Sequence, residues 1–169
     1  MRRASLLLIV LSVLSIAAGT SRFASVRLDV PVILRAPSRN GPTCVEMVLA
    51  YHGADSLVWS RVERAFTKQP VSTEALAATA RSLGYDARVT TPGMDSLTTF
   101  LRRGIPPIIA LDSNFGGRPI TRYMVITRFD SLGARFFVQA GSRPGRMPWH
   151  VLNAQWGMQN GRALVVTRR

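Results

Sequence analysis

The sequence holds one cysteine, Cys44, and two histidines, His52 and His150, the residue types of a thiol nucleophile and its base. A cysteine attacks as its thiolate, which forms when a helix N-terminus or an adjacent imidazole lowers the pKa of the thiol. His52 follows Cys44 on the same expected helix, about 12 Å along its axis, so it cannot pair with the thiol. His150 lies near the end of the chain, in a loop or short helix. These positions favour a buried, inert Cys44, and an active thiol stays as the alternative.

No group of cysteines and histidines has the spacing of metal ligands, so no metal or other cofactor is expected. A single cysteine also excludes an internal disulfide framework.

Cys44 belongs to the stretch NGPTCVEMVLAYHG, residues 40–53, which predicts a helix. Asn40 is a preferred N-cap residue, Pro42 fits the first turn, and Gly53 can end the helix. Cys44 would then lie one turn inside the helix, beyond the exposed amides that lower a thiol pKa.

The elements around this helix predict an α+β fold, in which helices pack on an antiparallel sheet. A β-rich run at residues 31–36 predicts a strand before the helix, and a weaker helix is expected at SLVWSRVERAF. Ser72 and Asp95 begin two further helices that end at Gly84 and Gly104. YDARVT returns as a strand, and a short helix is expected over WHVLNAQWG, where Trp149 and Trp156 more often pack a core edge than bind a ligand. The main sheet is expected from residues 107–111, 122–128, 134–139 and 161–167.

The first residues have the order of a secretory signal: Arg2 and Arg3, an apolar stretch at residues 6–18, and a small-residue site ending at Gly19. We expect cleavage after Gly19 and a secreted or periplasmic protein, with an N-terminal anchor in the cytoplasmic membrane as the alternative. The chain then divides into a signal peptide (1–19), a linker (20–30) and one domain (31–169).

The chain has a net charge of +13, which falls to +11 when residues 1–19 and their two arginines are removed. A basic protein can bind nucleic acid or anionic lipid. The arginines are scattered, without the interleaved aromatic residues of a nucleic-acid platform, so specific nucleic-acid binding is not expected.

The order of the elements and three short motifs resemble the papain-like cysteine peptidases of the bacteriocin-processing, double-glycine leader type. That family has a glutamine, four further residues, and then Cys-Gly-Pro at the start of a helix. NGPTCVEMVLAYHG is similar to this helix motif at nearly every position except the first. GIPPIIALD and RYMVITRFD are similar to a proline-rich strand entry and to the strand that opens His-Tyr-Val-Val. The resemblance runs from about residue 30 to 166 and implies a papain-like peptidase fold.

The resemblance places Asn40 at the family's nucleophile, Arg122 at its histidine and Arg35 at its oxyanion glutamine. Cys44 falls where relatives have a second, non-catalytic cysteine or an alanine. The segment VQAGSRPG, expected to hold the aspartate that orients the histidine, contains none. Asparagine is no nucleophile, and arginine keeps its proton near neutral pH. The resemblance therefore implies a catalytically inactive peptidase-like domain, a pseudoenzyme.

What remains of the cleft can still bind a ligand. Arginines pair with carboxylates and helix N-termini favour anions, so the expected site for a peptide or anionic ligand consists of Arg35, Arg39, Asn40 and Arg122. The same arginines are equally compatible with solvated substitutions that bind nothing. Two other functions stay open: an active peptidase that uses Cys44, and a structural domain of an envelope or export assembly. The family alignment further predicts that the side chains of Asn40 and Arg122 approach within direct or water-bridged reach, and that Cys44 lies on the packed side of the helix.

Overall fold

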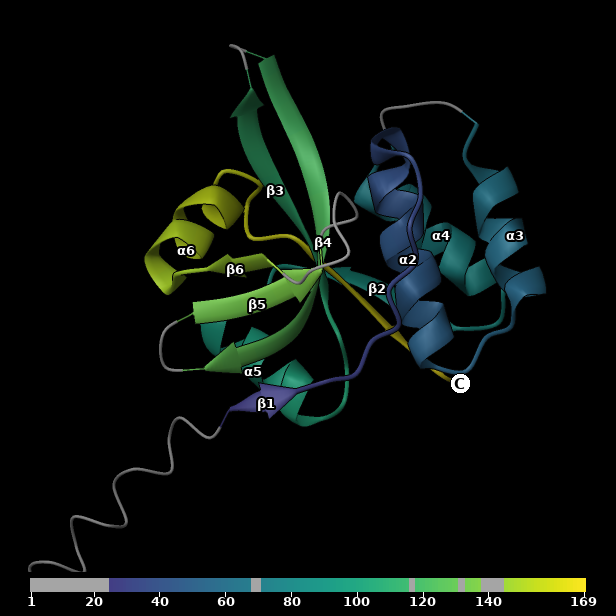
Figure 1. Cartoon of the computed structure of the whole chain (residues 1–169), viewed down its shortest axis with the longest axis horizontal. Coiled ribbons are helices and arrows are strands. Elements are labelled where there is room, and N and C mark those ends of the chain that lie inside the picture. Colours follow the sequence, from purple (N-terminus) through teal and green to yellow (C-terminus); the bar gives the residue numbers. More distant parts are fainter. Residues whose placement is uncertain (1–24, 68–70, 116–117, 131–132, 138–144) are drawn as a thin grey trace, which may run out of the picture.

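An antiparallel sheet with helices on both faces forms the structure, a computed structural model that describes residues 25–67, 71–115, 118–130, 133–137 and 145–169 (Figure 1). The predicted α+β class is therefore confirmed. The helices are η2 (Pro37–Arg39), α2 (Asn40–Tyr51), α3 (Ser56–Ala65), α4 (Thr73–Ser82), α5 (Met94–Arg102) and α6 (Trp149–Gly157). The strands are β1 (Val26–Arg27), β2 (Asp86–Thr90), β3 (Ile108–Phe115), β4 (Arg118–Asp130), β5 (Gly133–Phe137), β6 (Gly145–Met147) and β7 (Ala163–Thr167).

The sheet runs in the order β2-β7-β3-β4-β5-β6, and β1 pairs with β4 off this path. All of these pairings are antiparallel. The long strand β4 joins the two ends of the sheet, because its first part pairs with β3 and its last residues pair with both β5 and β1.

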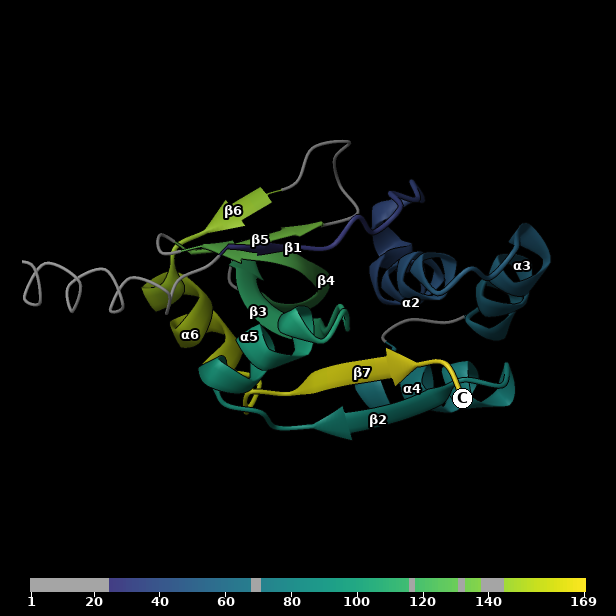
Figure 2. The same ribbon diagram turned by 90° about the horizontal axis from the view of Figure 1, so that it is seen from below.

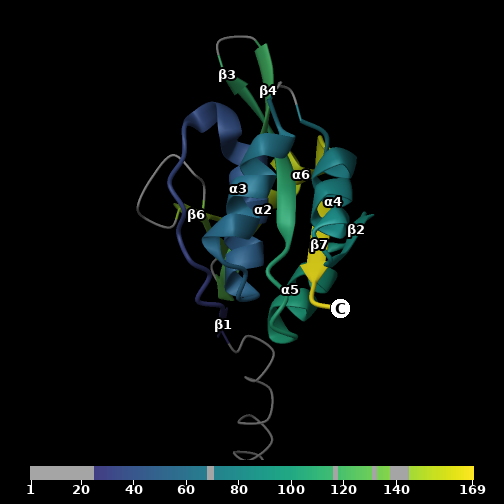
Figure 3. The same ribbon diagram turned by 90° about the vertical axis from the view of Figure 1, so that its right-hand side faces the viewer.

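One face of the sheet is covered by α2, α3 and α4, which stand in front of the strands in Figure 3. Side chains alternate along a strand, so every second residue faces these helices. On β3, β4 and β7 this apolar set is Ile108, Ala110, Tyr123, Val125, Leu164 and Val166. They pack against the buried side of α2 and form the first core.

The other face of the sheet is covered by α5 and α6, which Figure 2 shows between β1, β5 and β6 above and β7 below. The intervening residues of the same strands supply this second core: Ile109, Leu111, Met124, Ile126 and Ala163. Leu97 and Leu101 of α5 and Leu152 and Trp156 of α6 close it. The sheet is thus buried on both sides.

The helices follow the sequence signals closely. Ser72 caps α4 through its hydroxyl, which accepts from the amide of Ala75, and Asp55 caps α3 in the same way. Gly53, Gly84 and Gly104 end their helices with φ between +73° and +92°, a conformation that a side chain disfavours. α6 has the expected bounds, and α5 begins one residue before Asp95, with Gly93 as its N-cap.

The strand predicted at residues 31–36 is wrong. These residues are extended, but they do not belong to a ladder, and the paired residues lie earlier, at Val26 and Arg27. Val30 and Ile33 are buried while Val32 and Leu34 are exposed, so burial does not alternate as it would on a half-buried strand. Pro31 also has no N–H group to donate to a ladder.

The predicted signal segment and the first part of the linker lie outside the described residues, as do residues 138 and 139 of the predicted third strand. Among the residues described, no helix is both long and apolar enough to cross a bilayer.

Candidate functional site

Asn40 begins α2 and fastens it to β4. Its side-chain oxygen accepts a hydrogen bond from the main-chain amide of Tyr123, 83 residues away. The prediction that Asn40 caps the helix is therefore wrong: Asn40 has helical φ and ψ, and the cap position is Arg39, which makes no side-chain cap bond. The side-chain oxygen of Asn40 therefore accepts a hydrogen bond from β4 and not from the amides of the first turn of α2.

Gly41 makes this close approach possible. A Cβ atom at position 41 would lie 2.9 Å from Cδ2 of Tyr123 and 3.2 Å from Cδ1 of Leu76. The Tyr123 ring fills the space beside the helix, and its hydroxyl donates to the carbonyl oxygen of Val71 at 2.8 Å. Burial raises the pKa of the Tyr123 hydroxyl. The start of α2, the start of α4 and the middle of β4 therefore meet around one ring.

Arg122 precedes this contact on β4, so its main chain lies next to the Asn40 side chain, and the predicted approach of the two side chains stays a prediction. The Arg122 side chain is exposed. Within the part of the chain that the structure describes, it makes no hydrogen bond or ion pair. Of the four predicted ligand-binding residues, Arg122 is the one whose charge is directed to solvent.

Arg35 lies beside α2, and its Nε is 3.3 Å from Oε2 of Glu46. The Glu46 side chain is fully buried, whereas that of Arg35 is 32 % exposed. Removal from water raises the pKa of the Glu46 carboxyl, and the charge of Arg35 opposes that rise. Arg35 is thus the counter-ion of a carboxylate inside the first core.

Sequence reasoning missed Glu46. A signal for it exists, because Glu46 is the one acidic residue in the stretch 40–53, which is otherwise rich in apolar residues. A lone charge on the buried side of a helix requires a partner, and Arg35 is the arginine that precedes the helix in the extended segment.

The Arg39 side chain reaches the end of α3. Its guanidinium donates to the carbonyl oxygens of Glu63 and Phe66, the latter at 3.2 Å, and lies 3.9 Å from the Glu63 carboxylate. The Arg39 side chain therefore holds the start of α2 against α3.

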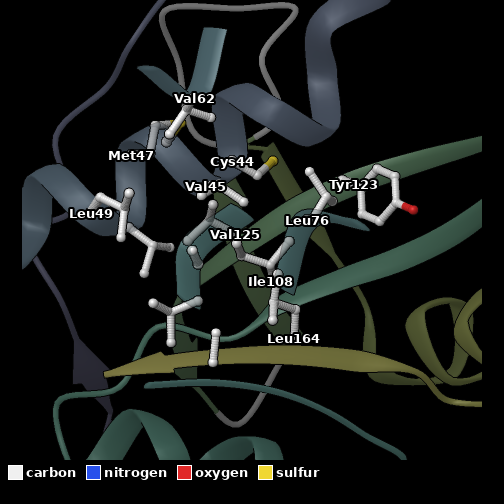
Figure 4. Packing of buried hydrophobic residues seen from close by; sticks show 14 of the residues in the cluster. Cys44, Val45, Met47, Leu49, Val62, Leu76, Ile108, Tyr123, Val125 and Leu164 are labelled. Carbon is white, nitrogen blue, oxygen red and sulfur yellow. The ribbon is translucent and has the colours of Figure 1, made fainter. Parts of the chain in front are cut away.

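Cys44 is buried in the first core, with 1 % of its surface exposed. Figure 4 shows it on α2 among Val62, Leu76 and Tyr123. Burial away from water raises the pKa of its thiol far above the ordinary value, so the thiol stays protonated at neutral pH.

Neither histidine serves this thiol. The ring of His52 hydrogen-bonds through Nε2 to the carbonyl oxygen of Val166 at 2.9 Å, and burial lowers its pKa. His150 is exposed on α6, which covers the opposite face of the sheet. Among the described residues, no group of three histidine, cysteine or acidic side chains is placed to hold a metal ion. Most of VQAGSRPG, which would hold the family's aspartate, lies outside them.

No protein-family model and no curated protein matches this chain by sequence. Solved structures do match it. A double glycine motif protease from an AMS/PCAT transporter, in complex with its leader peptide, has a TM-score of 0.64 at 22 % identity, over 88 % of this chain and 96 % of that one. A putative C39-like peptidase from Bacillus anthracis has a TM-score of 0.70 at 14 % identity, over 86 % and 98 %. The peptidase domain of Streptococcus ComA, a bifunctional ABC transporter involved in quorum sensing, has a TM-score of 0.64 at 18 % identity, over 82 % and 97 %.

These similarities confirm the fold implied by the resemblance. The chain has the fold of the double-glycine, C39-like peptidase domains, and it covers nearly all of each of these three.

Proposed function

We propose that this protein is an exported, catalytically inactive peptidase-like domain that binds a peptide or another anionic ligand where α2 meets β4. The observation that supports this most directly is the hydrogen bond from the Tyr123 amide to the Asn40 side chain. It puts an asparagine oxygen, engaged with the main chain, where the resemblance places a nucleophilic thiol.

The protonation states of the nearby groups support inactivity. Arg122 stands at the position of the family's histidine, and a guanidinium offers hydrogen-bond donors but no acceptor to serve as a general base. Cys44 is buried, its thiol pKa is raised, and neither histidine is placed to activate it. An active peptidase that uses Cys44 would need a large rearrangement of the first core.

The charge distribution supports binding of an anion or a peptide carboxylate. Arg122 is exposed, and a guanidinium can pair with a carboxylate through two parallel hydrogen bonds. Arg35 is partly exposed, although its charge also compensates Glu46. Arg39 contributes by positioning the first turn of α2, since its own donors are used on α3. One protein of the same fold has been crystallised with a leader peptide.

Binding is tested with a matched pair of probes. The first is an acetylated, amidated hexapeptide with two central glutamates, and the second has glutamines in their place. We expect the mature protein to bind the glutamate peptide more tightly. Arg122→Ala should weaken this binding by roughly 1.5–3 kcal/mol in titration calorimetry, the scale of a hydrogen bond to a charged group. Arg88→Ala, which removes an exposed arginine from the edge strand β2, is the control and should bind as the wild type does.

Inactivity is tested on the same preparation. Mass spectrometry of a mixture of unstructured peptides after long incubation should detect no cleavage. Thiol-dependent hydrolysis that disappears in Cys44→Ala would establish the active peptidase. Equal affinity of both hexapeptides for the wild type and Arg122→Ala would favour the structural domain.

Export is tested by N-terminal sequencing of protein recovered from the periplasm or the medium. We expect a new N-terminus near residue 20. An intact Met1 in the soluble cytoplasmic fraction would contradict export.

A further inference from the structure

A concave site lies on the face of the sheet away from α2. It is a pocket of about 630 Å³ between α5, α6 and the end of β4. This volume is within the range of small-molecule sites, about 300–1,000 Å³. None of the residues discussed above as a site for an anionic ligand lines it. Its lining consists of Met94, Asp95, Thr98, Thr99, Arg102, Phe129, Asp130, Trp149, His150 and Asn153.

The wall formed by α5 has opposite charges at its two ends. Asp95, Thr98, Thr99 and Arg102 are spaced i, i+3, i+4 and i+7, so they form one stripe along the helix. Leu97 and Leu101 lie on the other side of α5 and are buried in the second core. Seven residues of helix rise about 10 Å, so the backbone positions of Asp95 and Arg102 are about 10 Å apart along the helix axis. The two threonine hydroxyl groups lie between them.

The end of β4 and the start of α6 add two aromatic rings to the pocket, those of Phe129 and Trp149, beside the polar side chains of that wall. Their contacts fix the positions of both rings. The rings of Phe129 and Trp149 are 6.0 Å apart and inclined by 58°, and Trp149 donates from its indole nitrogen to the carbonyl oxygen of Asp130 at 3.1 Å. Arg102 lies over the Phe129 ring, with Cζ 5.7 Å from its centre. This contact uses the face of the guanidinium and sets its orientation, and Arg102 has a further interaction within the fold.

We propose that this pocket binds a short peptide of two to four residues with free termini. The α-ammonium group pairs with Asp95, the α-carboxylate pairs with Arg102, and an apolar or aromatic side chain lies against Trp149. An extended chain spans about 3.3–3.6 Å per residue, so a peptide of two to four residues covers about 7–14 Å, a range that includes the rise of about 10 Å between Asp95 and Arg102. His150 and Asn153 on the opposite wall are placed to hydrogen-bond the peptide groups.

The test uses the tripeptide Ala-Phe-Ala and two derivatives with one terminus blocked, the N-acetyl and the C-terminal amide forms. Titration calorimetry of the mature protein should show the free tripeptide binding at least about tenfold more tightly than either derivative, the effect of losing a charged hydrogen bond. Free phenylalanine should also bind more weakly than the tripeptide. Equal affinity for the free and the blocked tripeptides, or no binding of the free one at millimolar concentration, would overturn the proposal.

Variants assign each terminus to its partner. Asp95→Asn should weaken binding of the free tripeptide about tenfold and leave binding of the N-acetyl form unchanged. Arg102→Gln should also weaken binding of the free tripeptide about tenfold, and it should leave binding of the C-terminal amide form unchanged. Arg103→Gln removes the neighbouring exposed arginine, which is not part of the lining, and should bind like the wild type. Circular dichroism establishes that each variant is folded. If Arg103→Gln lost as much affinity as Arg102→Gln, the loss would come from the change in net charge alone. The assignment of the peptide carboxylate to Arg102 would then be overturned.

The fluorescence of Trp149 shows whether the tripeptide binds in this pocket. Binding at this pocket should change the intrinsic fluorescence of the wild type, and Trp149→Phe should remove that change because Trp59 and Trp156 do not line the pocket. Arg88→Ala, on the edge strand β2 and outside both sites, should leave tripeptide affinity unchanged. A fluorescence change that persists in Trp149→Phe would place the tripeptide elsewhere.

Discussion

The guanidinium of Arg35 lies 3.3 Å from the carboxylate of Glu46, and only the arginine has contact with solvent. Taking a carboxylate out of water costs several kcal/mol, which one counter-ion offsets only in part. Neither oxygen of the Glu46 carboxylate has a well-formed hydrogen bond in the part of the chain that the structure describes. The charge of Glu63 repels the Glu46 carboxylate, and the charge of Arg39 attracts it. The pair joins the extended segment before α2 to the helix at an electrostatic cost.

This cost predicts a pH dependence. The pKa of Glu46 is higher in the folded protein than in the unfolded chain, so the folded state binds more protons between the ordinary value, about 4.3, and the raised one. The free energy of unfolding should therefore fall as pH rises through this interval. Glu46→Gln should reduce the fall, which urea unfolding at several pH values measures. Glu74→Gln, on the exposed partner of Arg162, is the control, because Glu74 does not act on the Glu46 pKa. An unchanged pH profile in Glu46→Gln would contradict the prediction.

Cys44 should resist alkylation in the native protein. Iodoacetamide reacts with the thiolate, and Cys44 is both buried and protonated, so the reaction requires opening of the first core. We expect a rate on the order of 100-fold or more below that of the unfolded protein, measured by mass spectrometry. The matched comparison is Asn40→Cys in a Cys44→Ala background. Its thiol lies at the first residue of the same helix, where the helix N-terminus lowers the pKa, and should react readily. Comparable native rates for the two proteins would mean that Cys44 is accessible.

Much of the fold follows from local signals in the sequence. Ser72 and Asp55 cap their helices, and Gly53 and Gly84 end them, because each acts on backbone groups within a few residues. Asn40 shows where this reasoning stops. Its propensity indicates a cap, but its oxygen has a partner 83 residues away, and local propensity contains no information about such a competitor.

The part of the candidate site that depends on the helix motif could be predicted from the sequence. The directions of the side chains that depend on distant hydrogen-bond or ion-pair partners could not. The Asn40 side chain does meet β4, at the Tyr123 amide next to Arg122. The directions of Arg35 and Arg39 were not predictable, since they depend on Glu46 and on the carbonyl groups at the end of α3. The strand expected at residues 31–36 failed for a similar reason: it had the composition of a strand but no neighbouring ladder to join.

Gly41→Ala should destabilise the protein although alanine is the better helix former. The new Cβ would lie 2.9 Å from the Tyr123 ring, which the Val71 carbonyl and Leu76 hold in place. Overpacking of this kind costs about 1–3 kcal/mol, against a gain in helix propensity of about 1 kcal/mol. Thermal and urea unfolding measure the difference. Gly157→Ala at the end of α6, where a Cβ meets no atom within 4 Å, should be neutral or stabilising. A stabilised Gly41→Ala would contradict the close packing of α2 on β4.

Asn40→Ala should cost roughly 1–3 kcal/mol of unfolding free energy, because it leaves the Tyr123 amide without its acceptor. Asn40→Asp keeps an acceptor oxygen and adds a negative charge at a helix N-terminus, so it should retain most of the stability. Urea unfolding of the wild type and the two variants measures their free energies of unfolding. A loss in Asn40→Ala alone indicates a contribution from the hydrogen bond to Tyr123, not a local effect on the helix. If both variants lose the same stability, the bond to Tyr123 contributes little.

Strand β4 supplies alternate side chains to both hydrophobic cores, Tyr123 and Val125 to one and Met124 and Ile126 to the other. Pulling this strand out of the sheet therefore exposes both cores at once, so neither half of the molecule can melt while the other stays folded. In native-state hydrogen exchange, amides in the middle of β3 and β4 should open only with global unfolding, whereas those of the short strand β1 should exchange through local fraying. A fragment cut between α4 and α5 should not fold alone, and binding at either face should protect the same central amides.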